Sequence, residues 1–296
     1  MRTLYNLVRL ARPGQWIKNL FVLAALVFSR KVADPAARGA AVAGALVALA
    51  AFCLASSAVY AFNDVLDRRE DTRHPTKRRR PVAAGDLGVG TALAWSALLA
   101  AGALALASAL PPRFLLVVAA YLVLTAAYAL GLKRLAVLDV LVIAAGFVLR
   151  AYGGGAAIGV RVSPWLVLCT LTLALFLGFA KRQCERAALG EAAAGTRPLA
   201  WHLYDEKALG HMMTVSAALA LVTYMLYTVS PETVERAGHP WMCLTVLPVV
   251  YAVFRFHGAA VAGRTTGPVE MVRRDPAFVA ALGVWAAMVA VLLFAV

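Results

Sequence analysis

Charged residues are scarce in this sequence. Asp, Glu, Lys and Arg make up only 15% of the 296 residues, whereas 62% are hydrophobic, and the mean hydropathy is +0.77. A soluble domain carries roughly 25% charged residues, and a soluble core of this size has no room for so much apolar sequence. Disordered chains are poor in apolar residues. The composition therefore excludes nearly all soluble globular classes and disorder as well.

Cysteine and acidic residues are also few. The four cysteines form no Cys-x-x-Cys pair, and three of them lie inside or at the edge of apolar runs, which argues against a disulfide framework or a zinc site. Fifteen acids face 29 Lys and Arg, giving a net charge of +14. In a membrane protein such an excess indicates topology and anionic partners, and we expect no nucleic acid partner.

The apolar runs predict an all-α integral membrane protein, because a membrane helix needs about 20 mostly apolar residues. We expect a single domain over residues 1–296 with nine spans. They are Gln15–Ser29, Ala40–Phe62, Val89–Leu110, Phe114–Leu132, Val137–Tyr152, Pro164–Ala180, Gly210–Val229, Trp241–Phe256 and Pro276–Val296. Met1–Ala11 is predicted as an amphipathic helix on the membrane surface, with Leu4, Leu7, Val8 and Leu10 apolar and Arg2 and Arg9 polar. A cleaved signal peptide fits poorly, because the first apolar run starts late and eight more spans follow it.

Lys and Arg alternate strongly between the predicted loops. With the N-terminal side placed inside, 22 of them lie in inner segments and 6 in outer ones. By the positive-inside rule the N-terminus is cytoplasmic and the C-terminus is outside, in the inner (plasma) membrane of the cell. Twelve of the 15 acids also fall on the inner side, which indicates a polar site that faces the cytoplasm.

Three carboxylates follow the second predicted span. Asp64, Asp67 and Asp71 are spaced by three and four, so they share one face if the helix continues. Such close acids repel one another, and Mg²⁺ held by carboxylates and substrate phosphates relieves that repulsion. The alternative is a solvated helix end at the membrane boundary. His74, which follows in the same loop, is either a base or a solvated residue.

Four consecutive cations come next, Lys77, Arg78, Arg79 and Arg80. Guanidinium groups bind phosphate in a bidentate way, so this run beside the acids suits a diphosphate. Ordinary positive-inside anchoring is the alternative.

Asn63-Asp64-x-x-Asp67-x-x-x-Asp71, with the cations and Pro81 behind it, resembles the first motif of the UbiA prenyltransferase superfamily. The resemblance implies nine membrane helices around a cavity, a polar site at the cytoplasmic face, and Mg²⁺ between the aspartates and a substrate diphosphate. Asn63 would belong to the catalytic group.

Further segments resemble the decaprenyl-phosphate phosphoribosyltransferase branch, nearly from end to end. These segments are Arg12-Pro13-Gly14-Gln15-Trp16-Ile17-Lys18-Asn19, Leu132-Lys133-Arg134, Leu138-Asp139-Val140 with Arg150, Phe179-Ala180-Lys181-Arg182-x-x-Glu185, and Gly267-Pro268-x-Glu270-x-x-x-x-Asp275. The substrate-binding residues that this implies are Lys18, Lys133, Asp139, Arg150, Lys181, Arg182 and Glu185.

A second cluster departs from the usual superfamily pattern. Typical members carry another aspartate-rich motif near the sixth span, but Lys181–Arg186 holds one acid among three bases. Such a cluster suits additional phosphate groups, or else it anchors the helix at the inner face.

Arg150 lies inside an apolar run, where a charge costs at least ~2.5 kcal/mol near a helix centre. It is expected either to share a cavity with Asp139 or to snorkel to the outer surface. Gly153–Gly155 is predicted as a flexible outer loop, and Lys18 either snorkels or binds phosphate.

Together these features predict a Mg²⁺-dependent membrane glycosyltransferase, and the resemblance implies a place in cell envelope biosynthesis. It would move 5-phosphoribose from phosphoribosyl diphosphate (PRPP) to a polyprenyl (decaprenyl) phosphate lipid and release diphosphate; a homo-oligomer is left open. One rival is a UbiA-type prenyltransferase acting on an aromatic acceptor, against which Lys181 and Arg182 count. The other is a transporter or scaffold, which would carry polar groups near the midplane rather than at one face.

Overall fold

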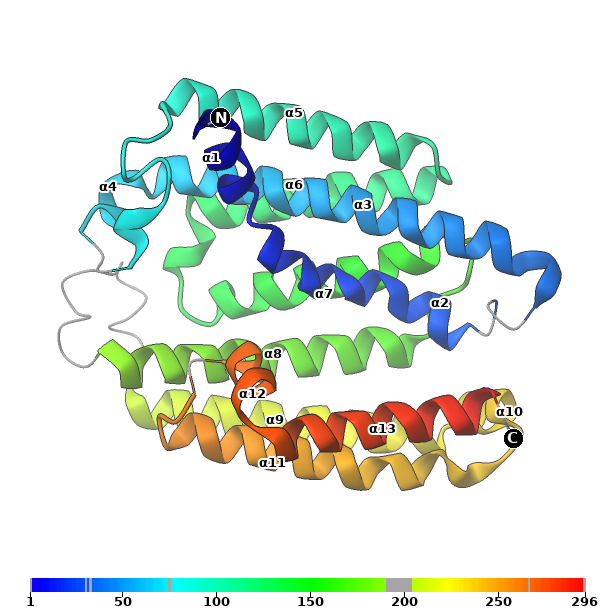
Figure 1. The fold of residues 1–296 in the computed structure, drawn as a ribbon. Coiled ribbons are helices and arrows are strands. Elements are labelled where there is room, and N and C mark those ends of the chain that lie inside the picture. The colour runs from blue at the N-terminus through cyan, green and yellow to red at the C-terminus, as the bar shows by residue number, and fades with distance from the viewer. Residues whose placement is uncertain are drawn as a thin grey trace. The chain divides into compact units, whose positions relative to one another are not determined.

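A computed structural model describes residues 2–29, 31, 34–73, 76–189, 204–265 and 267–294, and all regular elements in these ranges are helices (Figure 1). The chain forms two compact units. Unit 1 comprises the described residues of Met1–Val162, and unit 2 comprises the described residues from Ser163 onward.

The helices of unit 1 are α1 (Arg2–Ala11), η1 (Pro13–Leu23), α2 (Ala24–Phe28), α3 (Pro35–Leu66), α4 (Arg68–Asp71), η2 (Lys77–Arg79), α5 (Val89–Ser108), α6 (Pro112–Leu130), η3 (Leu132–Arg134) and α7 (Leu138–Ala157). Those of unit 2 are α8 (Pro164–Leu189), α9 (Glu206–Val229), α10 (Pro231–Ala237), η6 (Pro240–Thr245), α11 (Val246–Val261), α12 (Pro268–Arg274) and α13 (Pro276–Phe294). The predicted helix at the N-terminus is therefore confirmed as α1, while its place on the membrane surface stays a prediction.

Eight helices of the described residues are long and apolar enough to cross a membrane. They match eight of the nine predicted spans. The ninth, Gln15–Ser29, is not among them, because this stretch divides into the 3₁₀-helix η1 and the five-residue α2. The prediction of nine regular spans is therefore not confirmed.

Polar contacts with α3 explain why η1 is irregular. Arg12 precedes it in a left-handed conformation, with φ 52° and ψ 59°, and Pro13 follows. The buried Asn19 side chain donates hydrogen bonds to Ser56 Oγ at 3.2 Å and to Cys53 Sγ at 3.3 Å. Long 3₁₀ segments are uncommon because their own hydrogen bonds are poor. Bonds from neighbouring helices therefore hold η1 in a form that its apolar sequence does not reveal.

Helix α3 is the centre of unit 1 and packs against α1, η1, α5, α6 and α7. Its buried face is built from alanines such as Ala45, Ala48 and Ala55, and small residues let helix backbones approach closely. Phe52 sits among them and makes edge-to-face contacts with Phe114 and Tyr121, with ring centroids 5.9 and 5.4 Å apart. This aromatic cluster joins α3 to α6.

The glycine triplet Gly153–Gly155 lies inside α7 and is buried, so its prediction as a flexible outer loop is wrong. The glycines serve close packing. A Cβ on Gly153 would come within 2.7 Å of the Phe52 ring, and one on Gly154 would overlap the carbonyl oxygen of Val22 in η1. The absence of side chains brings the backbone of α7 against η1.

Unit 2 pairs α8 with α9, and α11 packs on α8, α9 and α13. Phe176 of α8 meets Phe256 of α11 edge-to-face, with centroids 5.6 Å apart. The Tyr224 hydroxyl lies 2.7 Å from Thr245 Oγ1 and accepts a hydrogen bond of 2.7 Å from the Trp285 indole. These contacts tie α9 to η6 and α13.

We predict that Gly154→Ala destabilises the protein by about 1–3 kcal/mol, because overpacking forces backbone shifts. Thermal unfolding in detergent, followed by tryptophan fluorescence, should show a clearly lower midpoint. Gly90→Ala in α5 is the matched control, since a Cβ there has open space around it, and helix propensity favours alanine. Equal midpoints for Gly154→Ala and wild type would contradict the close packing of α7 on η1.

Candidate active site

The three predicted carboxylates lie where α3 ends and α4 begins. Asp67 joins the two helices; its amide donates to the Asn63 carbonyl at 2.9 Å, and the Asp71 amide donates to the Asp67 carbonyl at 2.8 Å. The chain thus keeps a helical course through the junction. The spacing of three and four residues therefore gathers the carboxylates at one end of α3.

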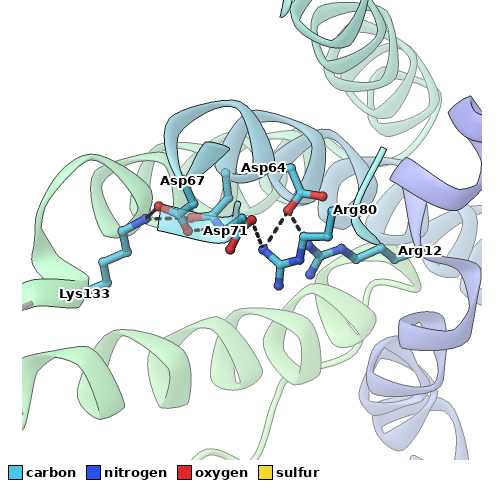
Figure 2. Close-up of polar contacts among 7 residues, drawn as sticks. Arg12, Asp64, Asp67, Asp71, Arg80 and Lys133 are labelled. Carbon is cyan, nitrogen blue, oxygen red and sulfur yellow. Dashed lines mark hydrogen bonds and ion pairs between the residues drawn. The ribbon is translucent and has the colours of Figure 1, made fainter. Parts of the chain in front are cut away.

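Asp64 and Asp71 share one cation (Figure 2). Arg80 Nη1 lies 3.1 Å from Asp64 Oδ1 and 2.6 Å from Asp71 Oδ2. Arg12, at the junction of α1 and η1, pairs with the same oxygen of Asp64. We refer to Arg12, Asp64, Asp71 and Arg80 as the ion-pair cluster.

Asp67 contacts a different cation. The Lys133 ammonium, carried by η3, pairs with Asp67 and donates to Asn63 Oδ1 at 3.1 Å. The Asn63 amide donates in turn to Asp67 Oδ2 at 2.8 Å. In Figure 2, Lys133 and Arg80 approach the carboxylates from opposite sides. Two predicted site residues that are 66 positions apart, Asp67 and Lys133, are thus brought together.

A small apolar core positions Arg80 and Arg12. Leu10 of α1 packs with Ala61 of α3 and with Val82 and Leu87 of the loop that follows Arg80. The Leu87 amide closes this loop by donating to the Pro81 carbonyl at 3.1 Å. Arg12 and Arg80 are therefore carried by a helix end and a loop that both pack against the end of α3.

The carboxylates of the ion-pair cluster are buried. The side chains of Asp64 and Asp71 are 1% and 3% exposed, whereas those of Arg12 and Arg80 are 25% and 22% exposed. Burial lowers the pKa of the Arg12 guanidinium, and the charge of Asp64 opposes that shift. Removing one member of such a pair leaves an uncompensated buried charge, which is strongly destabilising.

The cluster fits a divalent cation held by two carboxylates rather than three. Among the described residues, no three His, Cys, Asp or Glu side chains converge as metal ligands. Asp64 and Asp71 nevertheless converge on a single cationic nitrogen of Arg80. Mg²⁺ is commonly bound by one or two carboxylates, with substrate phosphates and water completing its coordination. These two residues therefore suit Mg²⁺ with a phosphate substrate.

Other predicted residues of unit 1 differ in how far their side chains are exposed to solvent. Of the four-cation run, Lys77 is half-buried and the side chains of Arg78 and Arg79 are exposed. Lys18 is half-buried on η1, and Asp139 is buried in the first turn of α7. His74 lies outside the described residues.

Arg150 is buried within unit 1 and does not snorkel to the outer surface. Its guanidinium donates to Asn19 Oδ1 at 2.8 Å, to the Gly146 carbonyl at 3.0 Å and to the Tyr121 hydroxyl at 2.7 Å. It also lies over the Tyr121 ring, 4.8 Å from its centroid. These contacts join η1, α6 and α7, while the predicted role of Arg150 in substrate binding stays a prediction.

The second predicted cluster belongs to unit 2. On α8, Arg182 Nη1 lies 2.9 Å from Glu185 Oε2 and Lys181 Nζ lies 3.9 Å from Glu185 Oε1. The three residues thus form one charged group along the helix. The Lys181 side chain is 55% exposed, whereas that of Arg182 is 14% exposed.

A cavity of about 750 Å³ in unit 1 lies away from the carboxylates. Its lining includes Arg113 at the start of α6, Tyr152 in the last part of α7 and Gly159 just after that helix. Lys133 follows the opposite end of α6. This cavity is therefore separate from the site that the sequence predicted.

Arg12 was not predicted as a site residue. It belongs to the first of the motifs that resemble the family, and a cation immediately before Pro13 at the start of an apolar run was the available signal. Asn19 and Tyr121, the partners of Arg150, were not predicted either. Polar side chains within predicted spans were the signal for these two.

Comparison with known proteins shows the class to which this chain belongs. Residues 20–262 match the UbiA prenyltransferase family, so the chain is a member of that family and a multi-pass integral membrane protein. The fold agrees: a UbiA homologue from Archaeoglobus fulgidus bound to DMAPP and Mg²⁺ superimposes with a TM-score of 0.72 at 16% identity, covering 98% of this chain and 100% of the other.

Two curated relatives are more similar in sequence. The decaprenyl-phosphate phosphoribosyltransferase of Mycolicibacterium smegmatis is 33% identical over 91% of this chain and 86% of its own length. The decaprenyl-phosphate phosphoribosyltransferase of Corynebacterium glutamicum is 30% identical over 91% of this chain and 81% of its own. The chain is thus similar to this branch of the family along almost its entire length.

Proposed function

We propose that the protein transfers 5-phosphoribose from PRPP to a polyprenyl phosphate, releasing diphosphate. The observation that carries this proposal is the similarity, at 30–33% identity over 91% of the chain, to decaprenyl-phosphate phosphoribosyltransferases. This similarity favours a phosphoribosyl donor over the prenyl diphosphate of an aromatic prenyltransferase.

The leaving diphosphate is the group that the carboxylates and cations would handle. Mg²⁺ held by Asp64 and Asp71 would supply Lewis acidity to the diphosphate oxygens, and Asp67 with Asn63 would complete the polar wall beside it. Arg80 and its neighbours Lys77, Arg78 and Arg79 would donate charged hydrogen bonds to the same oxygens. Donors aimed at developing charge in a partly buried site stabilise the transition state strongly.

The acceptor needs little activation. A lipid phosphate is already anionic at neutral pH, so no strong general base is required. One of its oxygens forms a bond to C1 of the ribose as the bond from C1 to the diphosphate oxygen breaks. In-line attack through an oxocarbenium-like state inverts the anomeric centre. The lipid tail would stay in the bilayer, and the sugar donor would arrive from the cytoplasm, as the charge distribution predicts.

Extra phosphate groups would be held by the remaining cations. PRPP carries a 5-phosphate besides its diphosphate, and the lipid brings another phosphate. Lys181 and Arg182, with Glu185 orienting them, are our candidates for one of these groups, and Lys18, Lys133 and Arg150 for the others. Asp139 would orient a polar group of the substrate.

The function is tested by incubating membranes that contain the protein with radiolabelled PRPP and polyprenyl phosphate. We expect a labelled lipid whose mass, by mass spectrometry, equals that of the acceptor plus phosphoribose. Membranes with Asp64→Asn, or with excess EDTA, should give no labelled lipid. Prenylation of an aromatic acceptor without any phosphoribosyl lipid would overturn the proposal in favour of the rival activity.

We further predict that Arg182→Ala raises the KM for PRPP by roughly 10-fold or more, because one charged hydrogen bond contributes about 1.5–3 kcal/mol. The effect of Lys181→Ala should be smaller, since its side chain is more exposed. A loss of uniform binding changes KM and spares kcat, and steady-state kinetics with both substrates varied separates the two.

Arg273→Ala is the control, because it removes another exposed cation of unit 2. An unchanged KM in both the Lys181 and the Arg182 variants would contradict a role in donor binding. It would indicate that these two charges only anchor the helix at the membrane face.

A further inference from the structure

We propose that Arg12 and Arg80 are internal counter-cations of the metal site. They neutralise Asp64 and Asp71 until a metal–diphosphate arrives, and they then transfer to the diphosphate oxygens. The identity of the anion rests on the proposed function, whereas the competition with a metal follows from the ion-pair cluster itself.

The first observation is the position of Arg80. Its Nη1 lies 3.1 Å from Asp64 Oδ1 and 2.6 Å from Asp71 Oδ2, so one cationic nitrogen bridges two buried carboxylates. A divalent cation held by Asp64 and Asp71 would use the same two carboxylates. Arg80 and the metal would therefore compete for their negative charge, and the guanidinium would have to give way for the metal to bind.

The second observation is the way Arg12 is held against Asp64. Arg12 adopts a left-handed backbone conformation, with φ 52°, which is uncommon for a residue other than glycine. Its guanidinium also lies over the Tyr60 ring of α3, 5.1 Å from the centroid. Backbone conformations of this kind persist only where surrounding structure enforces them, and they cluster at functional sites. Arg12 thus adds a second positive charge to the oxygen that Arg80 already contacts.

A thermodynamic coupling follows from this arrangement. A metal that binds alone must break ion pairs and leave two guanidinium groups close to its own charge. When diphosphate is present, the displaced guanidinium groups gain phosphate oxygens as new partners. Metal and diphosphate should therefore bind together much better than either binds alone, and the coupling must be reciprocal.

The coupling distinguishes Arg12 from residues with simpler roles. A purely structural residue, once removed, would weaken metal and diphosphate binding together. A residue that binds only phosphate would leave the affinity for metal alone unchanged. Removing a counter-cation should have two opposite effects. The metal alone should bind more tightly than in wild type, and diphosphate should increase the affinity for metal by a smaller factor.

The test uses Mn²⁺ as the probe, with full-length protein in detergent, because carboxylate sites that take Mg²⁺ also accept Mn²⁺. Binding is followed by the loss of the EPR signal of free Mn²⁺. We expect Arg12→Gln to bind Mn²⁺ alone roughly tenfold more tightly than wild type, since a like charge a few ångströms away is removed. Inorganic diphosphate, corrected for Mn²⁺ that it chelates in protein-free buffer, should then tighten Mn²⁺ binding by a smaller factor.

Two variants control the comparison. Arg9→Gln removes a cation of α1 that donates to the Arg79 carbonyl rather than to a carboxylate, so its Mn²⁺ affinity should equal that of wild type. Arg12→Lys keeps the charge and should also bind Mn²⁺ as wild type does. Weaker or unchanged binding of Mn²⁺ alone by Arg12→Gln overturns the proposal. Since no transfer reaction is measured, this outcome is independent of the labelled-lipid assay.

Discussion

Two carboxylates buried at the end of a membrane helix need a cation, and the organisation of unit 1 follows from that need. Asp64 and Asp71 are almost inaccessible, and Arg80 forms an ion pair with each of them. Arg80 reaches these carboxylates because Val82 and Leu87, in the loop that follows it, pack against Leu10 of α1. Arg12, which follows the last residue of α1, pairs with Asp64. Segments from three parts of the sequence thus supply the charges that compensate the buried carboxylates. The diphosphate that we propose as the leaving group would find cations beside them.

The polar network is possible because the helices around it pack through small residues. Gly154 brings α7 against the backbone of η1, and the alanine face of α3 admits its neighbours closely. At that short range Asn19 reaches α3, and Arg150 reaches Asn19. The side-chain nitrogens of Asn19 and Arg150 all donate hydrogen bonds within unit 1. Buried polar groups in proteins are nearly always paired in this way. The close packing of unit 1 and the placing of its cations therefore depend on one another.

Much of this could be predicted from the sequence. Eight spans follow from hydropathy alone, and the spacing of Asp64, Asp67 and Asp71 predicts carboxylates gathered at one helix end. The conformation of η1 could not be predicted, because side chains of α3 and α7 impose it. Gly153–Gly155 has the composition of a loop, yet tertiary packing uses it inside a helix. The choice of Arg12 and Arg80 for Asp64, and of Lys133 for Asp67, depends on how separate segments meet.

The dependence of unit 1 on the shared cation can be measured with a double-mutant cycle of Asp71→Asn and Arg80→Gln. The measured quantity is the free energy of unfolding, obtained by denaturant titration in mixed micelles. If Arg80 neutralises the buried carboxylate, each single variant leaves a charge uncompensated. The double variant should then lose less stability than the two single losses together, by roughly 1–3 kcal/mol. Losses that add within about 0.5 kcal/mol would contradict the account, because the two side chains would then contribute independently.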